Sequence, residues 1–207
     1  PMWTKIKWGI RILLVLIVGL FLHYTLPQHD VVRITETSNR VTQIGGNWIF
    51  YSIEDTGTGS ETSTTRAIRC IDAAYADGDV MVYRNEDTGW FWPPYFKWDS
   101  ATLQAEAANL KSTSAAPQWV VITHYGWRIP LFSAFPNAVN IYPVEGPDVT
   151  IIPWVNIILL AVLAFVILMI RKMWLQFRER MVDPALADVG ETFDAAGARV
   201  EAAQKEA

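Results

Sequence analysis

Residues 153–170 constrain this chain most, because they read PWVNIILLAVLAFVILMI and contain no charged residue. Eighteen helical residues extend about 27 Å at about 1.5 Å per residue, close to the roughly 30 Å hydrocarbon thickness of a bilayer. One Lys, Arg or Asp at the centre of such a helix costs about 2.5 to 3.5 kcal/mol. None occurs before Arg171 and Lys172. The segment therefore predicts a transmembrane helix.

A second apolar segment, residues 9–26, lies near the start of the sequence and follows the basic residues Lys5 and Lys7. A cleaved signal peptide has the same outline, so the residues after the apolar run decide between the two. His-Tyr-Thr-Leu-Pro follows Leu22, and this string offers no pair of small residues for cleavage. We therefore predict an uncleaved transmembrane anchor.

Basic residues lie at the ends of both apolar segments that are remote from the middle of the chain. They are Lys5, Lys7 and Arg11 on the first segment and Arg171, Lys172, Arg178 and Arg180 on the second. The positive-inside rule then predicts that both termini are cytoplasmic and that residues 27–150 are extracytoplasmic. We expect the lipid bilayer as a partner, contacted by membrane-interface anchors: Trp3, Trp8, Trp154, Trp174, Arg171 and Lys172.

The middle of the chain is acidic, with eight Lys or Arg against fourteen Asp or Glu in residues 27–150. This balance differs from the basic patches of nucleic-acid-binding proteins, so we expect no nucleic-acid partner. The one cysteine, Cys70, excludes an intramolecular disulfide, a CxxC pair, a thiolate zinc cluster and c-type haem attachment. We expect no cofactor.

Short alternating apolar runs separated by Gly, Asn and Asp predict antiparallel strands in this middle segment. The expected strands are residues 31–37, 47–53, 65–73, 80–85, 118–124 and 138–144, with a tight turn at residues 77–79. Residues 99–111 predict the one soluble helix, capped by Asp99 or Ser100, with Leu103, Ala107 and Leu110 on one face. The fold class is a membrane-anchored α+β protein whose small twisted sheet or partial barrel carries one packed helix.

Residues 89–98, GWFWPPYFKW, are unusually aromatic, and the Pro-Pro pair excludes a central strand. We favour a loop folded under the domain core. The alternative is an exposed platform that faces the membrane surface or a partner, since aromatic residues dominate interface hot spots. The candidate contact residues are Trp90, Phe91, Trp92, Tyr95 and Trp98.

Two further patterns suggest chemistry, and we prefer a structural interpretation of each. Asp-Thr-Gly occurs twice, which in aspartic peptidases places paired carboxylates around one water; here these would be Asp55 and Asp87. Glu54, Glu86 and Trp90 do not fit that context, so we expect two turns.

His29, Asp30 and His124 form a metal site only if the fold brings them together. His23, near the outer end of its segment, is expected to be an interfacial residue and not a haem or pigment ligand.

After the second apolar segment, the helix is expected to continue to Asp183-Pro184. Beyond it, apolar residues recur at spacings of three and four, which is a heptad pattern. The candidate docking seam is Leu186, Val189, Phe193 and Val200, with Ala196 and Ala203 between and after them. Gly190 and Gly197 weaken this helix, so we favour a frayed solvated tail over a docking helix. The expected divisions are residues 1–26, 27–150, 151–182 and 183–207.

Several strings in the chain are distinctive: HYTLPQHD at 23–30, VMVYRNEDTGWFWPPYFKWDS at 80–100, LQAEAANL at 103–110, THYGWR at 123–128 and FPNAVNIYPV at 135–144. Through them the chain resembles a bacterial family of double-spanning inner-membrane proteins known only as a domain of unknown function. The resemblance implies a bacterial inner membrane and a periplasmic middle domain. It supplies no catalytic residues.

Three function classes follow. The favoured one is a non-enzymatic accessory or assembly subunit of a larger inner-membrane complex, respiratory or photosynthetic, whose partners are other integral membrane subunits. The second is an envelope binding or sensing module, with an aromatic-lined pocket near Trp90 to Tyr95. The third and least favoured is an aspartic-type peptidase.

Overall fold

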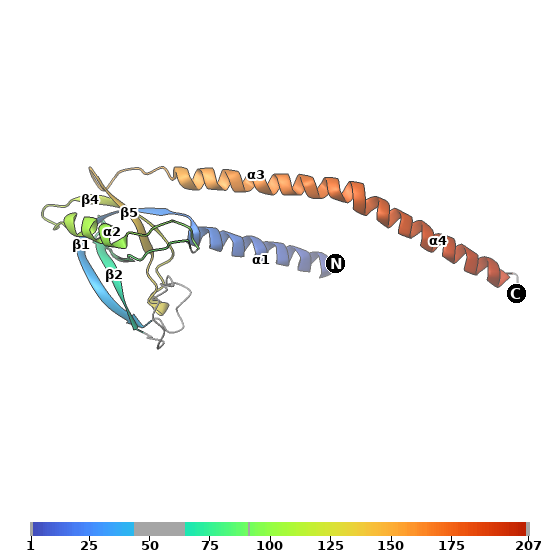
Figure 1. The fold of residues 1–207 in the computed structure, drawn as a ribbon, viewed down its shortest axis with the longest axis horizontal. Coiled ribbons are helices and arrows are strands. Elements are labelled where there is room, and N and C mark those ends of the chain that lie inside the picture. Colours follow the sequence, from blue (N-terminus) through green and yellow to red (C-terminus); the bar gives the residue numbers. More distant parts are fainter. Residues whose placement is uncertain (1, 44–64, 91, 206–207) are drawn as a thin grey trace. The chain divides into compact units, whose positions relative to one another are not determined.

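The computed structural model describes residues 2–43, 65–90 and 92–205, which fall into two compact units, Pro1–Pro153 and Trp154–Ala207. The first unit contains helix α1, five strands and helix α2, and the second is helical throughout its described length (Figure 1).

Helix α1 (Met2–Thr25) exposes its apolar side chains on all sides over most of its length. The helix ends where Thr25 Oγ1 donates back to the carbonyl of Phe21 at 2.9 Å and where Pro27 follows. Among the described residues, α1 and the stretch Trp154–Phe193 are long and apolar enough to cross a membrane. A helix that is apolar all round needs an apolar environment, either a large core or a bilayer.

Five strands form a closed barrel in the order β1-β2-β3-β5-β4. They are β1 (Gln28–Gln43), β2 (Thr65–Ala74), β3 (Val80–Arg84), β4 (Trp119–Tyr125) and β5 (Asn137–Val144). Five of the predicted strands and the α+β class are thus confirmed, whereas the predicted strand at residues 47–53 lies outside the described residues. The predicted turn is also confirmed: Gly78 has a φ of +95°, and the Tyr75 N–H donates to the Asp79 carbonyl at 2.8 Å.

The expectation of a purely antiparallel sheet is wrong at one seam of the barrel. Strands β3 and β5 pair in parallel, at Arg84 and Asn137, whereas the other four neighbouring pairs are antiparallel. The reason is topological. Strand directions cannot alternate around a closed ring with an odd number of strands, so five strands require one parallel pair. Closure of the ring also removes the unpaired edges that an open sheet would expose.

The barrel interior is filled by aliphatic side chains and Tyr83. Helix α2 (Ser100–Asn109) covers part of it through Leu103 and Ala107, which are buried, and Leu110, which is partly buried. The predicted cap is confirmed, because Asp99 Oδ1 accepts the Thr102 N–H at 2.9 Å. A short 3₁₀ turn, η2 (Pro130–Phe132), lies between β4 and β5.

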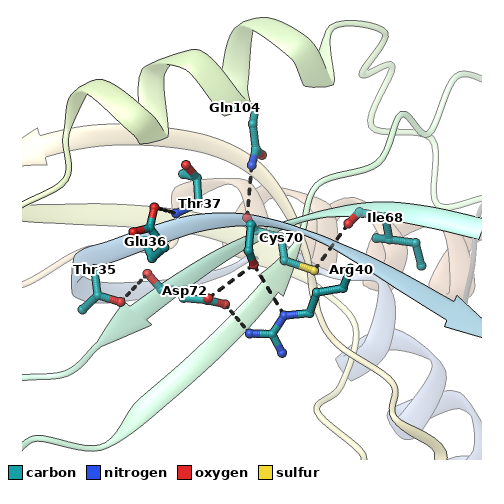
Figure 2. A network of polar contacts seen from close by, with 9 residues as sticks. Thr35, Glu36, Thr37, Arg40, Ile68, Cys70, Asp72 and Gln104 are labelled. Atoms are coloured by element: carbon teal, nitrogen blue, oxygen red, sulfur yellow. Dashed lines mark hydrogen bonds and ion pairs between the residues drawn. The ribbon is translucent and has the colours of Figure 1, made fainter.

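Polar contacts on the barrel wall fix β1, β2 and α2 together (Figure 2). Arg40 of β1 forms an ion pair with Asp72 of β2 at 2.9 Å. Gln104 of α2 donates to the carbonyl of Cys70 at 3.1 Å. The Cys70 thiol is 2% exposed, and burial raises its pKa to about 11. Cys70 is therefore a buried structural residue of β2.

The second unit comprises α3 (Trp154–Phe177), a π-helical turn η3 (Arg178–Val182) and α4 (Asp183–Lys205). The expected helix end at Asp183-Pro184 is wrong, and so is the favoured frayed tail, because the backbone stays helical to Lys205. Proline inside an α-helix clashes with the carbonyl four residues earlier, which here belongs to Arg180. Arg180 lies within η3, where the Asp183 N–H donates to Arg178 five residues back. The wider turn accommodates Pro184.

Candidate functional site

Residues 89–98 join β3 to α2 and expose most of their aromatic rings. Trp90 is 79% exposed, Trp92 63%, Trp98 56% and Phe96 50%; we call these four residues the aromatic patch. The Trp90 ring lies 5.3 Å from the Phe96 ring and 5.6 Å from the Trp98 ring, between centroids. The favoured expectation of a loop folded into the core is therefore wrong for these rings. Phe91 lies outside the described residues.

The loop is attached to the end of α1 by Tyr95, an aromatic residue that is not part of the patch. The Tyr95 hydroxyl donates to the carbonyl of Thr25 at 2.5 Å. The Tyr95 ring stacks on Tyr125 of β4 with centroids 4.8 Å apart and planes 9° apart. Trp92 stacks on Phe21 of α1 in a similar way, at 5.5 Å and 12°. Trp92 and Tyr95 consequently hold the loop beside the last two turns of α1.

A further attachment comes from the segment after β4. The Gly126 N–H donates to the carbonyl of Tyr24 at 2.9 Å, and Trp127 Nε1 donates to His23 Nδ1 at 2.8 Å. Gly126 has a φ of +93°, and a Cβ there would lie 3.6 Å from the Tyr24 ring. Glycine therefore suits both the turn and the close approach. His23 thus lies at the junction of helix and barrel, bonded to a tryptophan.

Lys97 is the one charged residue of this loop by sequence, and it is only 8% exposed. Its Nζ donates to Asn85 Oδ1 at 2.5 Å and to the carbonyl of Ala138 at 2.6 Å. Burial lowers the pKa of Lys97 to about 7, although the carboxylates of Asp87 and Glu86 oppose the shift. The loop thus turns its cation inward and its tryptophans outward.

A buried ion pair lies next to this lysine. Arg84 Nη1 is 2.9 Å from Glu86 Oε2, and both side chains are less than 5% exposed. Asn137 of β5 donates to the Glu86 carbonyl and accepts the Glu86 N–H at 3.0 Å. The Arg84 side chain also hydrogen-bonds Tyr24 at the end of α1. This network joins the parallel strand pair to the first helix.

The proposed catalytic carboxylates of a peptidase are not seen together. Asp55 lies outside the described residues. Asp87 Oδ1 accepts the N–H of Ser100, the first residue of α2, at 2.8 Å. Asp87 therefore has a structural role at the start of the helix, consistent with the preferred interpretation of its Asp-Thr-Gly motif as a turn.

The fold brings Asp30 and His124 together on neighbouring strands β1 and β4. Asp30 Oδ2 lies 2.9 Å from His124 Nε2 and accepts hydrogen bonds from Tyr83 at 2.5 Å and Tyr75 at 2.8 Å. Burial raises the pKa of Asp30, but the contacts with His124, Tyr83 and Tyr75 outweigh it and hold that pKa below its ordinary value. His29 points to the opposite face, as adjacent strand residues do. Within the described part of the chain, no group of three His, Cys, Asp or Glu side chains could hold a metal ion.

The remaining candidate residues lie on the long helices and are exposed. The interface candidates Trp3, Trp8, Trp154 and Trp174 are 57% to 66% exposed, and Arg171 and Lys172 are exposed on α3. On α4, Leu186 is 65% exposed, Val189 49% and Phe193 73%. Val200 lies where only the backbone of α4 is described. The membrane and docking roles of these residues remain predictions.

Sequence reasoning missed the buried polar residues, namely Arg84, Glu86, Lys97, Asn137 and the tyrosines around Asp30. One signal was available. Arg84, Asn85 and Glu86 follow the apolar run of β3, and Asn137 opens the apolar run of β5, at strand ends where the barrel closes.

Comparison with known proteins gives a family and one relative. The family described as "Protein of unknown function (DUF1523)" matches residues 4–178. An uncharacterized protein of Haemophilus influenzae (strain ATCC 51907 / DSM 11121 / KW20 / Rd) is 33% identical over 156 residues, covering 73% of this chain and 83% of that protein. No solved structure matches.

Proposed function

The chain belongs to the DUF1523 family, and from its own geometry we propose that it is a non-enzymatic accessory subunit of a larger complex in the bacterial inner membrane. In this proposal α1 and α3 cross the membrane, both termini are cytoplasmic, and the barrel is periplasmic. The apolar exposed helices and the basic residues at their remote ends support this topology. A respiratory or photosynthetic complex is the expected context.

The observation that carries the proposal is the exposed seam of α4. Leu186, Val189 and Phe193 follow each other at spacings of three and four, so they lie along one face of the helix. Their side chains are 49% to 73% exposed. Such a stripe is suited to knobs-into-holes packing against a helix of another subunit.

The charge of α4 favours a protein partner over the membrane surface. Helices that lie on membranes carry Lys and Arg on their polar face. In residues 183–205, by contrast, five acidic residues outnumber two basic ones: Asp183, Asp188, Glu191, Asp194 and Glu201 against Arg199 and Lys205. Anionic lipids would repel this helix, whereas a protein partner can offer complementary basic residues.

Purification of the tagged full-length protein from its source membranes in mild detergent tests the proposal. We expect other membrane subunits to co-purify, and we expect Val189→Asp to remove them because it places a charge in the seam. Ala187→Asp is the matched control, since it adds the same charge to an exposed residue outside the seam. A wild-type protein that migrates alone in native gels, or equal co-purification with both variants, would contradict the proposal.

A second candidate, an envelope binding module, is favoured by one observation. A shallow pocket of about 350 Å³ lies between the loop and α2. Its lining includes three aromatic residues, two acidic residues and one lysine: Tyr95, Phe96, Trp98, Asp99, Glu106 and Lys97. Rings and carboxylates together suit an organic cation.

Titration of the full-length protein with a polyamine such as spermidine tests this candidate through tryptophan fluorescence. We expect a saturable change that Glu106→Gln weakens and that Glu145→Gln, which alters a carboxylate outside the pocket, leaves intact. No change with wild-type protein, or equal weakening by both variants, would count against a binding module for this class of ligand.

A further inference from the structure

We propose that the aromatic patch is a membrane-surface anchor that inserts into the interfacial layer of the outer leaflet beside α1. The inference rests on the proposed topology, in which α1 crosses the membrane and the barrel lies outside it. It adds a second contact between the barrel and the bilayer. That contact fixes the orientation of the barrel as well as its attachment.

The position of Trp92 along α1 sets the depth. From Trp8, next to the basic residues, to Thr25 the helix extends about 26 Å, so Thr25 lies near the outer boundary of a roughly 30 Å hydrocarbon layer. Phe21 lies one turn earlier, about 6 Å deeper. The Trp92 ring stacks on Phe21 with planes only 12° apart. Trp92 therefore lies beside a part of α1 that is at or below the outer interface.

The loop is fixed at this height. Tyr95 bonds the last residue of α1, Thr25, and its ring is stacked on the barrel wall at Tyr125. Thr88 and Gly89 donate their N–H groups to the Lys97 carbonyl at 3.0 Å and 3.1 Å, which closes the base of the loop. Trp90 and Trp98 are in ring contact across that base. The patch thus extends from a closed loop beside the end of α1.

The chemistry of the loop fits a lipid interface. Tryptophan is enriched at the headgroup level of membranes, where an apolar ring with one polar N–H is suited to both sides of the boundary. Lys97 adds no charge to the exposed side of the loop, because its Nζ donates to Asn85 and to the carbonyl of Ala138. The exposed side of the loop therefore consists of aromatic rings without a cation among them.

Site-specific fluorescence in lipid-only vesicles tests the inference. The probe is the fluorophore NBD, attached to the full-length protein at Trp90→Cys or Trp98→Cys. The native Cys70 is retained in these variants, because it is buried. The vesicles are phosphatidylcholine with nitroxide quenchers at shallow or deep acyl positions. Two references are Val15→Cys in the middle of α1 and Ala115→Cys in the segment between α2 and β4. This segment leads into Trp119 at the start of β4. Trp119 is six residue steps, about 20 Å, from Tyr125, which lies near α1.

We expect shallow nitroxides to quench the probes at 90 and 98 several-fold more than the probe at 115, and deep nitroxides to quench the probe at 15. If the probes at 90 and 98 behave like the one at 115 while the probe at 15 is quenched, the anchor is overturned and the membrane span survives. If 90 and 98 are shielded from aqueous iodide in native membranes but not in lipid vesicles, a protein covers the patch and the anchor is equally overturned. An unquenched probe at 15 overturns the topology and the anchor together.

Discussion

The barrel interior and the loop at residues 89–98 place apolar and charged side chains in opposite ways. In the barrel, Val32, Ile34 and Ile71 are fully buried. In the loop, Trp90 is 79% exposed while Lys97 is 8% exposed. Hydrophobicity alone therefore does not decide burial here. The aliphatic residues fill a closed space, whereas Lys97 is held in the interior by hydrogen bonds to Asn85 and to the carbonyl of Ala138.

The largest expected effect breaks the buried charge network at the parallel seam. Arg84→Met leaves Glu86 buried without its ion-pair partner, which costs about 3 to 5 kcal/mol of the free energy of unfolding. The double variant Arg84→Met with Glu86→Leu should recover most of this loss, because neither member of the ion pair is then left buried without the other. The measurement is the urea midpoint of the full-length protein in detergent. Unfolding is detected by pulsed labelling of the Cys70 thiol, which is buried in the folded protein. Equal losses in the single and double variants would contradict the prediction.

The barrel interior is expected to be nearly as sensitive. Ile71→Ala removes a fully buried side chain from the core and should cost about 2 to 5 kcal/mol, since the surrounding residues cannot fill the cavity. The same Cys70 labelling measures the shift of the urea midpoint. Val80→Ala is the control, because Val80 of β3 is 78% exposed. A tolerated Ile71→Ala would show that the barrel is less well packed than its geometry indicates.

Lys97 makes the loop sensitive to pH. Its folded pKa of about 7 lies below the ordinary value of 10.5, so between these values the unfolded chain binds a proton that the folded chain lacks. Stability should therefore rise as the pH increases from about 7 towards 10. Lys97→Met should flatten this rise, which urea midpoints at pH 7, 8 and 9 can measure. An unchanged slope in the variant would assign the pH dependence to other groups.

Asp30 should affect the stability of the protein at low pH. The pKa of Asp30 in the folded protein lies below the ordinary value of 3.8. Its contribution to the free energy of unfolding is therefore complete above pH 3.8 and is lost as the pH falls through the folded pKa. Asp30→Asn should therefore reduce the loss of stability below about pH 4 relative to the wild type. Near-ultraviolet circular dichroism of the barrel aromatics measures the acid transition. A transition of the same steepness in both proteins would exclude Asp30 as a main contributor.

The smallest expected effect on stability is that of a substitution in the aromatic patch. Trp98→Ala in the aromatic patch should change the free energy of unfolding in detergent by no more than about 0.5 kcal/mol, as exposed positions usually do. A loss as large as that of Ile71→Ala would show that the patch belongs to the core and not to a surface. The urea midpoint reported by Cys70 distinguishes the two outcomes.

Local patterns in the sequence predicted most of the elements. Alternation located five strands, Asp77-Gly78-Asp79 predicted the hairpin, and Asp99 caps α2 as expected. The errors have two origins. The parallel pairing of β3 and β5 and the exposure of the aromatic rings depend on contacts between residues far apart in the sequence. The passage of the helix through Pro184 depends on the π-helical turn directly before it.

The candidate site could be located but not described from sequence. Residues 89–98 were singled out by composition, yet their core or surface position depended on partners far along the chain. Lys97 is buried because it meets Asn85, 12 residues away, and Ala138, 41 residues away. Tyr95 is anchored to Thr25, 70 residues away. The sequence alone does not show which distant residues these side chains contact.

The sequence by itself determined two long apolar helices, an α+β middle segment and its acidic charge, because length, periodicity and composition act locally. Only the tertiary structure decided that the strands close into a barrel and that a lysine takes the interior position while tryptophans stay outside. The physical reason is that burial of a charge is favourable only where hydrogen-bond acceptors converge on it. That convergence exists only once Asn85 and Ala138 have been brought together by the fold.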